Sequence, residues 1–136
     1  MDKKRLKVGI IGCGGIANGK HMPSIKAVNM ADMVAFCDLI EERAVKAAKE
    51  YGVPGAKVYT DYKELLADPE IDVVHVCTPN RSHADISIDA MHAGKHVMCE
   101  KPMAKSAADA RRMVAAAKET GKKLTIGYQH RHKAEA

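Results

Sequence analysis

The chain has 136 residues and a formal net charge of +5, and 46% of its residues are hydrophobic but only 4% are aromatic. This length suits one domain with a buried core that is filled by Val, Ile, Leu, Met and Ala, which is typical of parallel strands packed between helices. The basic residues are scattered without aromatic interleaving, which argues against a nucleic-acid partner, and no apolar segment is long enough to span a membrane.

The N-terminus has basic residues before an apolar stretch, but it is too short for a secretion signal. Lys3, Lys4 and Arg5 precede the stretch, and only five residues, two of them glycine, separate Lys7 from Cys13. A signal sequence needs about 7–15 apolar residues in succession. We therefore expect the protein to be cytoplasmic.

The run Leu6–Ile11 is predicted to form the first strand, and a glycine cluster follows it directly. Gly12, Gly14 and Ala17 have the spacing G-x-G-x-x-A, which marks the strand–turn–helix start of a dinucleotide-binding site. The first glycine permits a tight turn, the second lets the backbone approach a pyrophosphate, and the alanine lets the helix pack closely on the strand. Backbone N–H groups at the helix N-terminus would then meet the phosphate charge.

A second buried strand, Met33–Cys37, ends at Asp38, 21 positions after Ala17. A dinucleotide-binding fold expects an acidic residue about 20 positions on, where it binds the hydroxyls of the adenosine ribose. The alternative is that Asp38 is the N-cap of the helix predicted over Glu41–Tyr51, which Gly52 ends. Its place at the end of a strand favours the ribose.

The rest of the chain repeats the alternation of strand and helix. Asp61, followed three positions later by Glu64, has the pattern of a capping box at the start of a short helix through Leu65 and Leu66. Six strands alternating with helices predict an α/β fold with a doubly wound parallel sheet (Rossmann), and right-handed crossovers predict the strand order 3-2-1-4-5-6. The other predicted elements are a broken helix to about Val28 that restarts at Pro23, strands Lys57–Tyr59, Ile71–Cys77, His96–Cys99 and Leu124–Gly127, and helices Ser82–Ala93 and Ala107–Thr120.

Polar residues that follow strands are further candidates, because ligands of such a sheet bind outside the carboxyl ends of its strands. These candidates are Thr78, Pro79 and Asn80 after the fourth strand, Glu100, Lys101 and Pro102 after the fifth, and Tyr128, Gln129 and His130 after the sixth.

Among them, Lys101 has the chemistry for proton transfer. If the dinucleotide is a nicotinamide cofactor that takes hydride from a carbinol, the hydroxyl proton must also be removed, and a lysine in a partly dry cleft near the nicotinamidium charge is suited to accept it. The alternative is a surface lysine, or one paired with Glu100, although adjacent residues in extended backbone point to opposite faces.

The four cysteines, at positions 13, 37, 77 and 99, have no C-x-x-C spacing and lie within or at the ends of predicted strands. Small buried thiols in a reducing compartment are the favoured interpretation. A redox or metal role stays open, because the predicted strand order brings the four close to one sheet edge. His130 and His132 form a close pair, but without a third nearby ligand they predict no metal site.

Several of these segments together resemble the glucose–fructose oxidoreductase/inositol dehydrogenase family, known as Gfo/Idh/MocA. The resemblance covers essentially the whole chain, and its most specific mark is the segment Glu100–Pro102. Members of that family are nicotinamide-dependent oxidoreductases that act mostly on sugars and polyols, with an N-terminal Rossmann domain and a larger C-terminal α/β domain. The matching segments are the G-x-G-G-I-A loop from Gly12 with His21 beyond it, Asp38, Thr78–Asn80 with His83, Glu100–Pro102 and Gly127–Gln129.

The resemblance implies a role for each matching residue. Lys101 would be the catalytic residue and, with Glu100, would lie beside the nicotinamide ribose and the reacting carbon, which Gln129 would approach. Pro102 corresponds to a position that often follows a cis peptide in the family. The cofactor-binding residues implied are Gly12, Cys13, Gly14, Gly15, Ile16, Ala17, Asp38, Leu39, Thr78, Pro79, Asn80, His83, Glu100, Lys101 and Gln129, and no metal ligand is implied.

The resemblance also implies how the domains are organised. Residues 1–127 are expected to form the Rossmann domain, and residues 128–136 to begin the linker to a substrate domain that this chain lacks. A truncated piece, an interrupted gene and a stand-alone module are all open accounts of this ending. We expect an apolar patch where the second domain would pack, near the sixth strand and Glu100–Pro102, and a homo-oligomer at full length.

The leading hypothesis is the cofactor-binding domain of an oxidoreductase that transfers hydride between NAD and a sugar, polyol or related carbinol, and that is inactive as this piece alone. Asp38 favours NAD over NADP, because its carboxylate would bond both ribose hydroxyls and repel a 2′-phosphate. The alternative is a non-catalytic NAD-binding sensor or regulatory module. The retained segment Glu100–Pro102 favours the enzyme, since a sensor needs no lysine for proton transfer.

Overall fold

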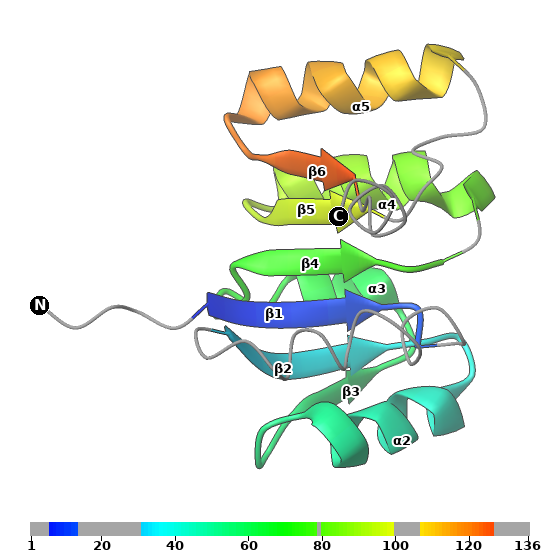
Figure 1. Cartoon of the computed structure of the whole chain (residues 1–136), viewed down its shortest axis with the longest axis vertical. Helices are drawn as coiled ribbons and strands as arrows, with labels where there is room; N and C mark the ends of the chain where they lie inside the picture. The colour runs from blue at the N-terminus through cyan, green and yellow to red at the C-terminus, as the bar shows by residue number, and fades with distance from the viewer. Residues whose placement is uncertain (1–5, 14–30, 79, 100–106, 127–136) are drawn as a thin grey trace, which may run out of the picture.

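A computed structural model describes residues 6–13, 31–78, 80–99 and 107–126 of the chain, with the side chains of residues 80–83 and 126 excepted. Within these ranges six strands form one sheet in the order β3-β2-β1-β4-β5-β6, and all neighbouring strands are parallel (Figure 1). The predicted fold class and strand order are confirmed. The strands are β1 (Leu6–Ile11), β2 (Ala31–Cys37), β3 (Lys57–Tyr59), β4 (Val73–Val76), β5 (His96–Cys99) and β6 (Leu124–Ile126).

Helices pack on both faces of this sheet and create two hydrophobic cores. On one face, buried side chains of α3, α4 and α5, such as Leu65, Met91 and Met113, pack against the sheet. On the other face, Ala44 and Ala47 of α2 pack against β1 and β2. The described helices are α2 (Glu41–Tyr51), α3 (Tyr62–Leu66), α4 (Asn80–His92) and α5 (Ala107–Thr120).

Side chains of strand β1 contribute to both hydrophobic cores. Val8 and Ile10 belong to the core under α2, whereas Ile11 belongs to the core under the other helices, as the two-residue period of a strand requires. Gly9 faces Leu65, and a Cβ at Gly9 would lie 2.9 Å from the Cδ2 atom of that leucine. The missing side chain therefore lets α3 pack against the middle of the sheet.

Strand β2 departs from simple alternation at one position. Val8 pairs with Met33 but Gly9 pairs with Ala35, so Val34 is an extra residue in the ladder. Such a bulge puts two successive residues on one face. Val34 and Ala35 accordingly both contact the core under α3 and α4.

The predicted element bounds differ from the observed ones by one to two residues at several ends. Strand β2 begins at Ala31 rather than Met33, because Leu6 of β1 supplies it with a pairing partner. Strand β4 covers Val73–Val76 rather than residues 71–77, and Val74 and Val76 are buried while the residues between and before them are half-buried. Helix α4 begins at Asn80, two residues earlier than predicted.

The short helix α3 begins as the sequence predicts. The carboxylate of Asp61 accepts a hydrogen bond from the backbone N–H of Lys63 at 2.9 Å, which makes Asp61 the N-cap. Leu65 and Leu66 are buried at the other end of the helix.

Among the described helices, none has the length and apolar composition needed to cross a bilayer. The predicted linker, residues 128–136, lies outside the described residues, as do most of the residues of the predicted apolar patch.

Candidate functional site

The carboxyl ends of the strands all lie at one edge of the sheet, where the arrows in Figure 1 point. Gly12 follows β1 at this edge with φ +92°, a conformation that favours glycine. A Cβ at Gly12 would also lie 2.9 Å from the carbonyl carbon and oxygen of Cys77 and 3.0 Å from the nitrogen of Thr78. The turn after β1 is therefore pressed against the turn after β4, and only glycine fits between them.

Backbone hydrogen bonds hold this turn in place on both sides. The N–H of Gly12 donates to the carbonyl of Cys37 at 2.8 Å, and the N–H of Cys77 donates to the carbonyl of Ile11 at 2.8 Å. Strands β1, β2 and β4 are thus joined at the point where the glycine motif begins.

Asp38 lies directly after β2 at the same edge, as predicted. Its Oδ2 atom accepts a hydrogen bond from the N–H of Cys13 at 2.8 Å, and its Oδ1 atom accepts one from the N–H of Ile40 at 2.8 Å. The N–H of Asp38 donates to the carbonyl of Tyr59 at 3.1 Å. The carboxylate thus lies between the end of β1 and the start of α2.

The alternative interpretation of Asp38 as the N-cap of α2 is wrong. The N-cap of that helix is Ile40, which makes no side-chain capping bond. Asp38 lies two residues too early, and its bond to the Ile40 N–H closes a turn of the connection before the helix.

Next to this carboxylate, two apolar side chains are exposed. The exposed fraction of Leu39 is 91% and that of Ile40 is 46%, although both follow a buried strand. Leu39 has almost no core contact to explain its hydrophobic character. An apolar surface beside a carboxylate suits an adenosine, whose base is flat and whose ribose carries hydroxyl donors.

Three of the four cysteines are buried and the fourth, Cys77, is half-buried, and all are free thiols. The Cys13 thiol donates to the carbonyl of Cys37 at 3.4 Å. Burial, with the negative charge of Asp38 beside it, raises the pKa of Cys13 and Cys37 to about 12. Both are therefore protonated at neutral pH, which disfavours thiolate redox chemistry at these two positions.

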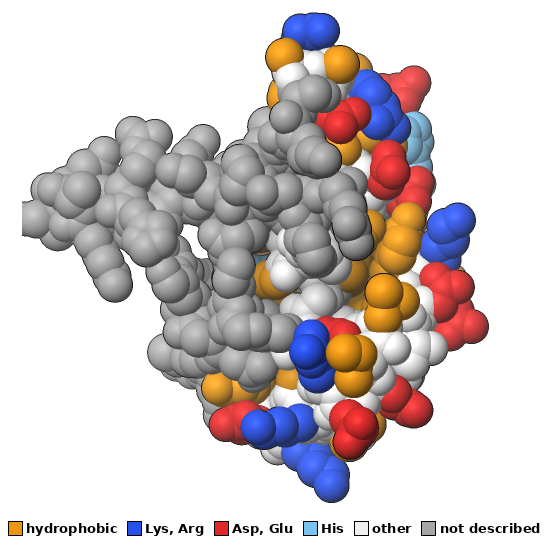
Figure 2. Space-filling model, turned by 90° about the vertical axis from the view of Figure 1, so that its right-hand side faces the viewer, with side chains coloured by type: hydrophobic (Ala, Val, Ile, Leu, Met, Phe, Trp, Pro, Cys, Tyr) orange, Lys and Arg blue, Asp and Glu red, His pale blue; other side chains and the backbone are white. Residues whose placement is uncertain are grey.

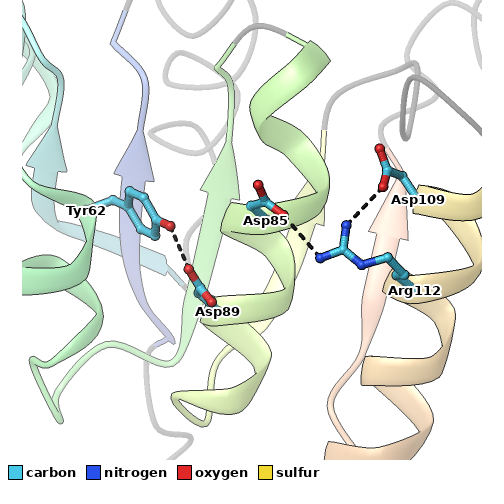
Figure 3. Close-up of polar contacts among 5 residues, drawn as sticks. All are labelled: Tyr62, Asp85, Asp89, Asp109 and Arg112. Carbon is cyan, nitrogen blue, oxygen red and sulfur yellow. Dashed lines mark hydrogen bonds and ion pairs between the residues drawn. The ribbon is translucent and has the colours of Figure 1, made fainter.

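A second set of polar side chains joins the helices on the α3–α4–α5 side of the sheet (Figure 3). The hydroxyl of Tyr62 donates to Asp89 at 2.6 Å, and burial with this bond raises the pKa of Tyr62. Arg112 bridges Asp85 at 3.2 Å and Asp109 at 2.9 Å. These groups satisfy one another, and we assign them to helix packing. In the described part of the chain no three His, Cys, Asp or Glu side chains are placed to hold a metal ion.

The structure therefore brings together part of the predicted site. Cys13, which follows Gly12 in the turn, bonds Asp38, and Thr78 lies against the same turn. Asn80 is the first residue of α4, and Leu39 is exposed beside Asp38. The side chains of Asn80 and His83 are not described, and the predicted residues outside the described ranges are Gly14, Gly15, Ile16, Ala17, Pro79, Glu100, Lys101, Pro102 and Gln129.

Sequence reasoning missed the part played by the backbone of Ile40 and Tyr59. The tripeptide from Asp38 to Ile40 does carry a signal, since an Asp commonly accepts a bond from the backbone two residues on. No comparable local pattern points to Tyr59, which is 21 positions away. The space-filling view looks onto this end of the sheet, and its described part mixes charged and hydrophobic side chains (Figure 2).

The residues present fit a dinucleotide on two counts. Gly12 has the positive φ and the close packing on the turn after β4 that the tight turn of a dinucleotide motif needs, and an acidic group follows β2 beside an exposed apolar side chain. Both features occur where the doubly wound fold binds its ligands, at the switch point between β1 and β4.

Comparison with known proteins agrees with a dinucleotide-binding domain. Residues 6–128 match the family described as "Oxidoreductase family, NAD-binding Rossmann fold" (GFO_IDH_MocA). Inositol 2-dehydrogenase of Salmonella typhimurium is 38% identical over 128 residues, and D-glucoside 3-dehydrogenase of Escherichia coli is 39% identical over 131 residues. The matches cover 93% and 96% of this chain but 38% and 37% of those enzymes, so the chain spans well under half the length of these curated relatives.

Solved structures show the same relationship. A 3-ketoreductase from Actinomadura kijaniata, in complex with TDP-benzene and NADP, has a TM-score of 0.86 at 30% identity, over 97% of this chain and 43% of that chain. The apo scyllo-inositol dehydrogenase of Lactobacillus casei has a TM-score of 0.87 at 26% identity, over 97% of this chain and 39% of that chain. The chain therefore belongs to the Gfo/Idh/MocA family of oxidoreductases, and it contains the family's NAD(P)-binding Rossmann domain.

Proposed function

We propose that this chain is the cofactor-binding domain of an NAD-dependent oxidoreductase that transfers hydride between the nicotinamide and a carbinol of a sugar or polyol. The observation that carries the proposal is the hydrogen bond from the Cys13 N–H, in the turn that begins at Gly12, to the Asp38 carboxylate at the carboxyl edge of the sheet. The named relatives include dehydrogenases of inositol and of a D-glucoside, which supports this substrate class. The non-catalytic sensor has no comparable support.

The preference for NAD rests on the charge of Asp38. At about 4 Å and an effective dielectric constant near 20, a unit charge of a 2′-phosphate and the carboxylate repel by roughly 4 kcal/mol. NADP would also lose a hydrogen bond to a charged group, worth about 1.5–3 kcal/mol. Even if solvent halves the repulsion, the two effects together correspond to about 100-fold or more in affinity. Arg43, exposed on the first turn of α2, is the nearest cation in sequence that would offset the repulsion.

Calorimetric titration of the chain with NADH and with NADPH tests this proposal. We expect the dissociation constant for NADPH to be at least about 100-fold larger than that for NADH. The relative from Actinomadura kijaniata was solved with NADP, so NADPH is a realistic competitor in this comparison. Equal dissociation constants, or tighter NADPH, would contradict the NAD assignment, and failure of both to bind would overturn the proposed function.

The chemistry of the complete enzyme needs a group that exchanges the proton of the carbinol. Glu100 and Lys101 follow β5, whose last residue Cys99 pairs with Val76 of β4. We place Lys101 in this role, with Glu100 beside the nicotinamide ribose. The bound nicotinamide would supply the hydride acceptor, and Lys101 would hold the hydroxyl proton that leaves with it.

Residues 1–127 are proposed to form this cofactor domain, and residues 128–136 to lead out of it. Because the chain spans only about 38% of its relatives, much of the substrate pocket is proposed to lie in a further α/β domain. Assembly of the complete protein as a homo-oligomer is part of the same proposal.

A further inference from the structure

The carboxylate of Asp38 is bonded at both oxygens by the protein itself. The Cys13 N–H comes from the turn after β1 and bonds Oδ2, and the Ile40 N–H comes from the connection to α2 and bonds Oδ1, each at 2.8 Å. The two donors lie on opposite sides of Asp38 in the sequence, 25 residues before it and two after it. One side chain therefore fixes two separate segments.

This arrangement demands a carboxylate rather than any polar side chain. An ionised carboxylate accepts at both oxygens, whereas an amide has one oxygen and must turn its NH₂ group toward one of the two donors. A serine has one side-chain oxygen, which cannot occupy the positions of both Oδ1 and Oδ2. Cys13 is completely buried, so its N–H would be left without this acceptor away from water.

The same geometry leaves acceptor capacity for a ligand. Each carboxylate oxygen has two lone pairs, and the backbone bonds use one on each. The remaining lone pairs suit the two hydroxyl donors of a ribose. The Cys13 N–H, by contrast, is directed to the protein's own carboxylate.

We propose that Asp38 is a positioning residue for the glycine-rich turn as well as the ribose ligand, so that cofactor choice and the shape of the turn depend on one side chain. The ligand part of this inference rests on the proposed function. It follows that removing the Asp38 carboxylate to admit NADP also releases Cys13, and with it the turn that both cofactors share. A single substitution at position 38 will not convert the protein to NADP.

The test compares D38N and D38S with D61N. Asp61 accepts a bond from the N–H two residues on in the same way as Asp38, at 2.9 Å, but is exposed at the start of α3. Amide hydrogen exchange is measured by NMR in the cofactor-free proteins. We expect each Asp38 variant to speed exchange tenfold or more, relative to Ile10 and Val74 in the core, at whichever of the Cys13 and Ile40 amides loses its acceptor, and D61N to leave both amides unchanged.

Cofactor binding is the second measurement, because a loosening confined to the Cys13 amide would not weaken the binding of NADPH. We expect D38S to bind both NADH and NADPH at least tenfold more weakly than the unmodified chain, and D61N to bind as the unmodified chain does. Unchanged exchange at both Cys13 and Ile40, or a tenfold gain in NADPH affinity, overturns the inference. If the unmodified chain binds neither cofactor, the proposed function fails, while exchange at Cys13 and Ile40 still decides the positioning role.

One measurement needs no variant and covers the case in which D38N or D38S fails to fold. A scalar coupling across the hydrogen bond, between the nitrogen of Cys13 and the Cγ atom of Asp38, is expected in the unmodified, cofactor-free chain labelled with ¹⁵N and ¹³C. Its absence, in a sample where backbone couplings across β1 and β2 are detected, overturns the inference.

Discussion

At the scale of single residues, Gly12 is subject to two independent constraints. Its φ of +92° disfavours any other residue, and a Cβ there would collide with the backbone of Cys77 at 2.9 Å. Gly94 has a similar φ of +88°, but a Cβ at that position would meet nothing within 4 Å. Comparing substitutions at the two glycines therefore distinguishes the cost of backbone strain, present at both, from the cost of close packing, present only at Gly12.

Gly12→Ala is expected to destabilise the fold more than Gly94→Ala. Strain alone costs about 1–2 kcal/mol in either variant, and displacing the Cys77 backbone adds about 1–3 kcal/mol in Gly12→Ala. Urea unfolding gives both free energies. We also expect Gly12→Ala to lose NADH binding and Gly94→Ala to keep it. Equal costs would show that the turn after β4 moves aside freely.

Lys101 can be tested only where the substrate pocket is complete. In a protein that joins this domain to the rest of the enzyme, Lys101→Ala should lower kcat by about 10²–10⁴-fold while NADH binding changes little, since general acid–base groups contribute on this scale. Lys118→Ala, on the exposed last turn of α5, is the control and should leave kcat unchanged. A Lys101→Ala enzyme with normal kcat across the pH range would restrict Lys101 to a structural role.

At the scale of elements, the connection from α3 to β4 is anchored through Asp68. Its side chain accepts a bond from the Glu70 N–H at 2.9 Å and pairs with Lys57 at 3.2 Å, and its carbonyl accepts from the buried amine of Lys95 at 2.6 Å. Burial raises the pKa of Asp68, but the Glu70 bond and the charge of Lys57 more than offset it, so that the pKa lies below its ordinary value. Burial also lowers the pKa of Lys95.

Asp68→Asn is expected to reduce stability at neutral pH more than at acidic pH. A carboxylate whose pKa is lower in the folded state contributes stability above its unfolded pKa, and that contribution is lost as the pH falls through the folded value. The stabilising contribution of Asp68 is therefore lost below about pH 4. We expect a cost of about 1 kcal/mol at pH 7, since Lys57 is half exposed and the ion pair is weak, and a smaller cost at pH 3. A cost independent of pH would contradict this account.

At the scale of the whole molecule, one sheet separates two cores, and the candidate site lies at its carboxyl edge. The proposed cofactor site lies within this sheet, whereas much of the substrate pocket is proposed to lie in the part of the relatives' length that this chain does not span. Positioning of the two reactants supplies a large part of the rate acceleration in hydride transfer. A domain that holds only one reactant should therefore bind without catalysing.

The 136-residue chain is accordingly expected to bind NADH and to oxidise no polyol at a measurable rate. NADH at about 100 times its dissociation constant should raise the free energy of unfolding by about 2.7 kcal/mol, which a thermal melt detects, whereas myo-inositol alone should have no effect. Absorbance at 340 nm follows turnover over a panel of polyols with NAD. Robust turnover would show that the further domain is dispensable.

Much of this organisation is determined by the sequence alone. The β-branched runs, the glycine cluster after Ile11 and the acidic residue at position 38 lie in short windows, and each specifies its own strand, turn or helix start. Because parallel strands need right-handed crossovers, these local elements leave few topologies, and the predicted order of the sheet is the observed one.

Tertiary structure decided what depends on residues far apart in the chain. The sequence predicts Gly52 only as the end of α2, but its φ is −77°, and glycine is required there because a Cβ would lie 2.7 Å from the carbonyl oxygen of Ala48 and 2.8 Å from both Ala56 and Phe36, the last of which lies on β2. The bulge at Val34 and the bond from Cys13 to Asp38 likewise appear only once β1 and β2 are paired. Local propensity and handedness act within a few residues, whereas these contacts join backbone segments that meet only in the assembled sheet.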